Sequence, residues 1–203
     1  MSLFWTETAL GIMLDAAMDG DNPSVSVTHV GAYDAGTALT SVTGVASTDV
    51  FTKTSHGMAD GTVVKLTSLS GGTGLNVNKW YFVRDQAANT FKLAPVPAGT
   101  AVDFSVDVSA VTVTPYLEIS GGSYARQVIA FNAAGTHADG ATIDDSTNGA
   151  VIPIPAGATV DAISGHSASS AGTLLFLDDV TPEAFGGAGT YTVTDVDGSL
   201  SVT

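Results

Sequence analysis

Short runs of β-branched and aromatic residues recur along the chain about every 8–12 residues, separated by turns rich in Gly, Asn and Asp. The pattern is most regular between residues 47 and 116, where such runs occupy residues 62–66, 79–84 and 90–94. Runs this short suit strands joined by tight turns better than helices. The spacing therefore predicts an all-β fold, with a small barrel or sandwich formed by residues 47–116.

One segment has a helical period instead. Apolar residues at positions i, i+3, i+4, i+7 and i+8 predict an amphipathic helix over residues 2–19: Leu10, Met13, Leu14, Ala17 and Met18. We expect the apolar side chains of this segment to be buried against their own domain or a neighbouring subunit: Phe4, Trp5, Leu10, Met13 and Leu14. We also expect the strand at 25–30 to end in a break at residues 31–36, and a short helical turn at 181–185.

Charge divides the chain into two parts. Five of the six basic residues lie within residues 47–116: Lys53, Lys65, Lys79, Arg84 and Lys92. The same segment holds five acidic residues, whereas the remainder holds Arg126 and fifteen acidic residues, which accounts for the net charge of -14. Such a difference indicates two modules. We predict a discontinuous, β-sandwich-like host domain of residues 1–46 and 117–203, interrupted by an inserted β module of residues 47–116.

The segment 119–131 marks the point where the chain returns to the host domain. It contains the pair Gly121-Gly122, then Tyr124-Ala125-Arg126, then an alternating apolar run. We expect this run to pair with the first 46 residues and not with the module that precedes it. Arg126 is the only basic residue outside the insert, so we expect it to hold a host carboxylate as a bidentate pair, with Tyr124 as a further structural residue.

Composition excludes several classes of partner. A strongly acidic chain does not suit nucleic acid or an anionic membrane, both of which need a basic surface. The chain has no cysteine, so disulfides and thiolate metal sites are excluded. No apolar run is long enough to span a membrane, and the N-terminus lacks the basic region of a secretory signal. Charged residues make up 13%, against about 25% in typical soluble domains, which suits a surface that packs against neighbours.

No catalytic set is apparent, and we expect neither enzymatic activity nor a cofactor. The four histidines, His29, His56, His137 and His166, lie in separate segments without metal-ligand or proton-relay spacing, and we expect each in a turn or at the surface. His56 is expected to bond backbone groups within its turn. Gly165-His166-Ser167 lacks the strand-turn-helix context of a nucleophile elbow.

Two weaker possibilities for binding remain open. The paired carboxylates Asp144-Asp145 and Asp178-Asp179 are candidate calcium ligands, and the alternative is that they are solvated or pair with a neighbouring subunit. Trp80 and Tyr81 are candidates for stacking on sugar rings. The alternative is that strand alternation directs Trp80 and Phe82 to one face and Tyr81 to the other, so that one set fills the core of the module.

Two sets of motifs resemble proteins of tailed bacteriophages. The first set is His56-Gly57-Met58-Ala59-Asp60-Gly61, the strand at 80–83 and Asn89-Thr90-Phe91-Lys92-Leu93, which resembles a small β module of phage virion proteins. The second set lies in the flanks and resembles short decoration, minor tail or fibre-like virion proteins: residues 14–16, 30–31, 120–127, 151–153, 172–175 and 189–194. In those proteins the link before the Ser-Gly-Gly-Ser-Tyr motif is short, whereas here it carries the whole insert.

The resemblance implies a non-enzymatic structural component on the exterior of a tailed-phage virion. On this interpretation the host domain anchors the chain to a major capsid or tail protein and forms a homo-oligomer, for which we take a trimer as the working expectation. The insert would project to solvent at the virion surface. The alternative function is adhesion, with the insert binding a cell-surface glycan through Trp80 and Tyr81.

Overall fold

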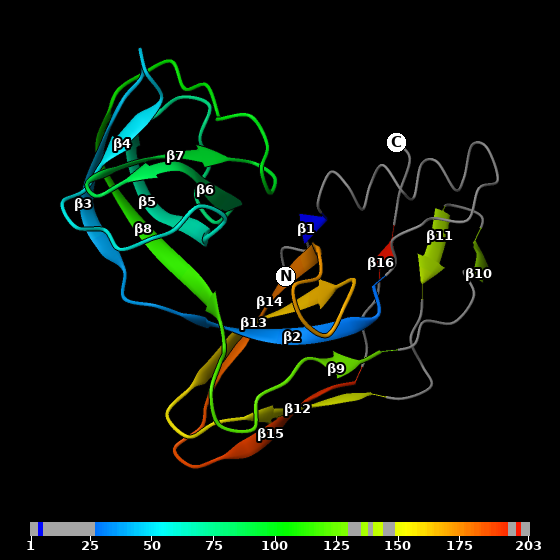
Figure 1. Cartoon of the computed structure of the whole chain (residues 1–203). Helices are drawn as coiled ribbons and strands as arrows, with labels where there is room; N and C mark the ends of the chain where they lie inside the picture. The colour runs from blue at the N-terminus through cyan, green and yellow to red at the C-terminus, as the bar shows by residue number, and fades with distance from the viewer. Residues whose placement is uncertain are drawn as a thin grey trace.

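A computed structural model describes residues 27–129 and 149–194, together with the backbone of four short strands at 4–5, 135–137, 140–143 and 198–199. All the regular structure in these residues is β, and none of it is helical. The predicted all-β class is therefore confirmed for this part of the chain. The strands form two lobes, which we call the barrel and the second lobe (Figure 1).

The barrel is a closed ring of six strands. Its members are β3 (Leu39–Val45), β4 (Val50–Thr52), β5 (Val63–Gly71), β6 (Trp80–Ala87), β7 (Thr90–Ala94) and β8 (Val108–Glu118). The pairing order is β3-β4-β7-β6-β5-β8, and β8 closes the ring because it pairs with both β5 and β3. A closed barrel leaves no unpaired strand edge. The ring includes β3, so it begins ahead of the insert boundary expected at residue 47.

Aromatic side chains fill the barrel. Phe51 lies between Phe91 and Phe104, with ring centroids 5.4 and 5.1 Å away, and all three are buried. Phe104 comes from the loop between β7 and β8, not from a strand. His56 lies at the edge of this cluster: its Nδ1 accepts from Met58 N–H at 3.1 Å and its Nε2 is 2.7 Å from Ala87 O. The expectation that His56 bonds backbone groups is confirmed.

The second lobe is built on an open antiparallel sheet in the order β1-β14-β13-β2, with bounds Phe4–Trp5, Leu174–Ala184, Thr159–His166 and His29–Ala35. The free side of β2 is lined by the end of β8 and by β9 (Gln127–Val128). A separate pair, β12 (Ala150–Ile154) and β15 (Gly189–Val193), shares an aliphatic core with this sheet. A small sheet of β10 (Gly135–His137), β11 (Gly140–Ile143) and β16 (Gly198–Ser199) completes the regular structure.

Three local predictions are wrong. Phe4–Trp5 form strand β1, paired with Leu177 and Phe176 of β14, where a helix was expected. The rest of that helix, with Leu10, Met13 and Leu14, lies outside the described residues. The expected break at 31–36 falls mostly within β2, and the expected helical turn at 181–185 lies mostly within β14. In both cases cross-strand pairing outweighs the local preference of Gly and Pro.

The outer wall of the barrel is packed against the second lobe. Val63, Trp80 and Phe82 of the barrel meet Tyr33, Ala162 and Leu177 of the second lobe in one buried group, which we call the junction cluster. The neighbouring residues of β6, Tyr81 and Val83, point into the barrel. The predicted alternation along β6 is confirmed, and both faces of this strand are buried.

Candidate functional site

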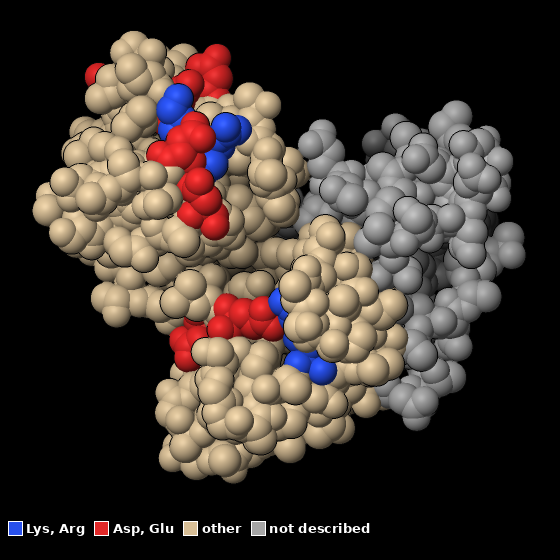
Figure 2. Space-filling model, viewed as in Figure 1, with Lys and Arg blue, Asp and Glu red and all other residues tan. Residues whose placement is uncertain are grey.

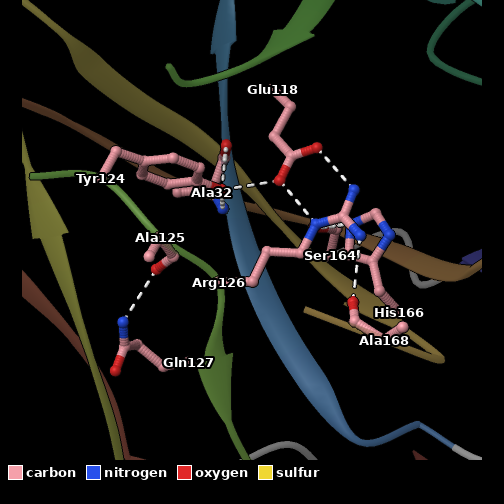
Figure 3. A network of polar contacts seen from close by, with 9 residues as sticks. All are labelled: Ala32, Glu118, Tyr124, Ala125, Arg126, Gln127, Ser164, His166 and Ala168. Atoms are coloured by element: carbon pink, nitrogen blue, oxygen red, sulfur yellow. Dashed lines mark hydrogen bonds and ion pairs between the residues drawn. The ribbon is translucent and has the colours of Figure 1, made fainter. Parts of the chain in front are cut away.

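Tyr124 and Arg126, the polar side chains singled out in the segment 119–131, which we call the return segment, come together with Glu118, the last residue of β8 (Figure 3). Arg126 donates from Nε to Glu118 Oε1 and from Nη2 to Glu118 Oε2, both at 2.7 Å. Its Nη1 donates to the carbonyl of Ala168 at 3.1 Å. The expected bidentate pair is therefore present, and it ties the return segment to both β8 and the loop after β13.

The return segment pairs with the N-terminal part of the chain, as predicted. In β9, Gln127 and Val128 pair with Val30 and His29 of β2. Between β8 and β9 the chain leaves the ladder, so the middle of β2 has no strand on this side. Ile119 N–H still donates to Ala32 O at 2.9 Å.

Tyr124 provides the hydrogen-bond acceptor for the backbone N–H of Ala32, which has no strand partner on this side. Its hydroxyl accepts from Ala32 N–H at 3.0 Å and donates to Glu118 Oε1 at 3.0 Å. Gly31 makes room for this arrangement, because a Cβ there would lie 2.9 Å from the Tyr124 hydroxyl and 3.0 Å from Ser164 Oγ. We call Glu118, Tyr124 and Arg126 the return network; its Tyr124 hydroxyl takes the place of the missing strand at Ala32.

His166 and Ser164 of β13 lie beside the return network and are buried, with exposed fractions of 1% and 0%. His166 Nε2 is 2.9 Å from Ser164 Oγ, and the imidazole stacks on Tyr33 with an interplanar angle of 9°. Burial, and then the nearby charge of Arg126, lower the pKa of His166 to about 4. The expected turn or surface position of His166 is therefore wrong. A serine and a histidine this deeply buried offer no access to a substrate.

The members of the return network shift one another's pKa values. Burial by itself would raise the pKa of Glu118, but the hydrogen bonds and charge of Arg126 outweigh it and the pKa is lowered. Burial raises the pKa of the Tyr124 hydroxyl, and the negative charge of Glu118 adds to that shift. Glu118 is thus ionised and Tyr124 neutral at neutral pH, which suits a hydroxyl that donates to a carboxylate.

The structure contradicts the proposed sugar-stacking site. Trp80 is 0% exposed and Tyr81 is 1% exposed. Trp80 lies in the junction cluster, and Tyr81 fills the barrel, where its hydroxyl accepts from Asn76 N–H at 2.9 Å. Neither ring presents a face to a saccharide, because stacking needs an exposed aromatic surface.

The aspartate pairs do not assemble a calcium site in the described part of the chain. Asp144 and Asp145 lie outside it. Asp179 forms an ion pair with Lys65, while burial and the charge of Asp179 raise the pKa of Asp178. A calcium site needs several oxygen ligands converging on one point. No group of three or more His, Cys, Asp or Glu side chains suited to a metal occurs among the described residues.

Sequence reasoning missed three residues that organise these contacts: Glu118, Lys65 and His166. Lys65 carried a usable signal, because it is a single charge within the apolar run Val63-Val64-Lys65-Leu66 and must find a partner if that strand is covered on both faces. Glu118 is the acidic residue nearest to Arg126 in the sequence, eight positions away, and that spacing was also a usable signal. His166 had no comparable signal, because Tyr33, on which it stacks, lies on a strand that is distant in the sequence.

Comparisons with known proteins give no relative for this chain. No family model, no curated protein and no solved structure matches it. In the part of the chain that the structure describes, no helix is long and apolar enough to cross a membrane.

Proposed function

We propose that the chain is a non-enzymatic structural component on the exterior of a tailed-phage virion, as a capsid decoration or minor tail protein. The observation that carries the proposal is that the side chains best suited to catalysis or ligand binding are occupied inside the protein. His166, Trp80, Tyr81 and Arg126 are all used in packing or in internal hydrogen bonds. What the described residues offer to the outside is a stable β surface, which is the requirement of a protein that assembles.

The surface supports assembly as well. Most of the described surface in Figure 2 is uncharged, and the charged side chains gather in two places, one on the barrel and one beside the junction. A surface with few charges loses little solvation when it is covered by a neighbour. The motif resemblance in residues 56–61 and 120–127 points in the same direction.

In this proposal the second lobe is the sandwich-like host domain, completed by a helix in the N-terminal segment after β1, and it anchors the chain. The barrel is the inserted module and projects from it. The barrel is held at the junction cluster, so it projects at a fixed angle and does not swing on a linker. The partners are a major capsid or tail protein and further copies of this chain, with a trimer as the expected symmetry, and the location is the virion surface.

Imaging of intact particles tests the proposal. Cryo-electron microscopy of virions should show density of the size and shape of the barrel on the outer surface, in contact with the shell or tail through the second lobe. Particles that carry a tag in the barrel loop at 95–99 serve as the matched control, since the tag should add density to the barrel only. Absence of the chain from purified particles, or density inside the shell, would contradict the proposal.

The adhesion alternative loses its proposed site with the burial of Trp80 and Tyr81. A glycan-binding screen of the full chain is therefore expected to give no signal. Saccharide binding in that screen would favour adhesion and would place the binding site elsewhere on the barrel.

A further inference from the structure

Lys65 is a buried lysine with one polar partner. It lies in β5 of the barrel, with an exposed fraction of 6%, and its Nζ contacts Asp179 Oδ2 in β14 of the second lobe. The two residues are 114 positions apart in the sequence. Among the described residues this is the only hydrogen bond or ion pair that Lys65 Nζ makes.

Aromatic rings enclose the lysine end of this pair. Lys65 Nζ lies 3.8 Å from the centroid of the Trp80 ring and 5.9 Å from that of Tyr116, and the two rings meet edge to face at 4.8 Å. The Asp179 side chain is more open, with an exposed fraction of 31%. The amine is therefore shielded from water, while the carboxyl group has a path to it.

The contact holds the amine against one carboxylate oxygen, with the amine inside the aromatic rings and the carboxyl group at their open side. Reacting groups that are held in contact reach effective molarities of about 10⁵–10⁸ M in well-oriented systems. Amide formation needs such a contact and a path for the water that leaves, and the exposed side of Asp179 provides that path.

We propose that Lys65 and Asp179 join in an intramolecular isopeptide bond across the junction. A proton passes from Lys65 Nζ to Asp179 Oδ2, and the Nζ lone pair then attacks Cγ of the carboxyl group, which gives a tetrahedral intermediate. The Cγ–OH bond then breaks, and the hydroxyl group leaves as water with a proton from Nζ, carried by solvent at the exposed side of Asp179. One N–C bond forms, one C–O bond breaks, and one water is released without oxidant or reductant.

The bond would give this chain a covalent staple that its composition otherwise denies it. The sequence contains no cysteine, so no disulfide can link the lobes. An amide between β5 and β14 would fix the barrel on the second lobe at the point where the junction cluster already holds it. The inference does not depend on the proposed function, since it concerns only residues within the chain.

Intact mass spectrometry of the folded, purified full chain, denatured just before measurement, tests the proposal. The expected mass is that of the sequence less one water. Lys65→Arg retains the positive charge but cannot form the amide, and Asp179→Ala removes the electrophile, so both should have their full sequence masses. Lys79→Arg is the matched control on an exposed lysine and should still show the loss.

Peptide mapping distinguishes the cross-link from a succinimide, which also loses water and can form at Asp-Gly steps such as Asp60-Gly61. With the isopeptide bond, trypsin does not cleave after Lys65, and a branched peptide containing residues 65 and 179 appears and resists hydroxylamine. A wild-type mass equal to that of the sequence, or a water loss that persists in Lys65→Arg, would overturn the proposal. Melting curves of the Lys65→Arg chain establish that it is folded when its mass is read.

Discussion

The barrel and the second lobe satisfy their backbone hydrogen-bonding groups in different ways. The barrel closes on itself through β8, so its backbone groups pair within the ring, and its interior is filled by apolar and aromatic side chains. The second lobe is an open sheet whose strand β2 lacks a neighbour over part of its length. There the Tyr124 hydroxyl accepts from Ala32 N–H of β2 and donates to Glu118, which is paired with Arg126.

This difference indicates which perturbation each lobe resists. A closed apolar barrel depends on volume and is nearly indifferent to charge. An open sheet completed by buried ionisable groups depends on charge, and so on pH. The junction cluster couples the two lobes, so damage to either should be felt in the unfolding of the whole chain.

The largest expected effect is a cavity in the barrel. Phe91 is fully buried against Phe51, so Phe91→Ala removes a whole ring from a packed core. We expect the free energy of unfolding to fall by about 3–5 kcal/mol, with little change between pH 7 and pH 5. Urea unfolding at the two pH values measures both quantities.

Lys92→Ala is the matched control, because Lys92 is the next residue of β7 and is only partly buried. Its loss of stability should be under about 1 kcal/mol, as for most surface substitutions. If Phe91→Ala were no worse than Lys92→Ala, the barrel would not depend on its aromatic core.

Both lobes could be predicted from the sequence only where the controlling interactions are local. Strand runs such as 79–84 are visible because alternation and β-branching are properties of neighbouring residues. Arg126 was also predictable, since a single basic residue among fifteen acidic ones needs a partner. That partner, Glu118, is the nearest acidic residue in the sequence, but no local pattern records the path of the chain beside β2 that brings the two side chains together.

Two predictions failed because residues that are distant in the sequence control the structure there. Trp80 was a candidate for sugar binding because the faces of aromatic rings bind the C–H groups of carbohydrates. Its burial depends on Ala162 and Leu177, which lie about 80 or more residues later in the chain and cover the outer wall of the barrel. The break expected at Gly31 failed for a similar reason. Glycine is needed there because Tyr124 and Ser164 approach the strand closely.

The second effect is a pH dependence that belongs to the second lobe. The pKa of His166 is about 4 in the folded chain, against an ordinary value of 6.5. Between these values the unfolded chain binds a proton that the folded chain does not, so stability is complete above pH 6.5 and falls as the pH is lowered toward 4. The loss attributable to His166 is on the order of 3 kcal/mol.

His166→Gln removes this titration while keeping a polar group beside Ser164. The difference in unfolding free energy between pH 7 and pH 4.5 should therefore shrink in the variant. Glu118, whose pKa is lowered, adds its own loss of stability at still lower pH in both proteins. An unchanged pH dependence in His166→Gln would show that the imidazole titrates normally and is not excluded from water.

The smallest of the three effects comes from Arg126→Ala, which leaves the Glu118 carboxylate without its bidentate partner. Removing one member of a fully buried ion pair costs about 3–5 kcal/mol, but the side chain of Glu118 is 27% exposed and gains water in the variant, so we expect about 2 kcal/mol. Arg126→Lys keeps the charge without the planar fork and should lose about half as much.

Adding Glu118→Gln to Arg126→Ala should recover part of the loss, because the unpaired charge is then gone. Urea unfolding of the wild type, Arg126→Ala, Glu118→Gln and the double variant forms a double-mutant cycle that measures the coupling. A coupling near zero would mean that Tyr124 and the β9 pairing hold the return segment without the ion pair, and the contrast between a charge-dependent second lobe and a volume-dependent barrel would then rest on His166 alone.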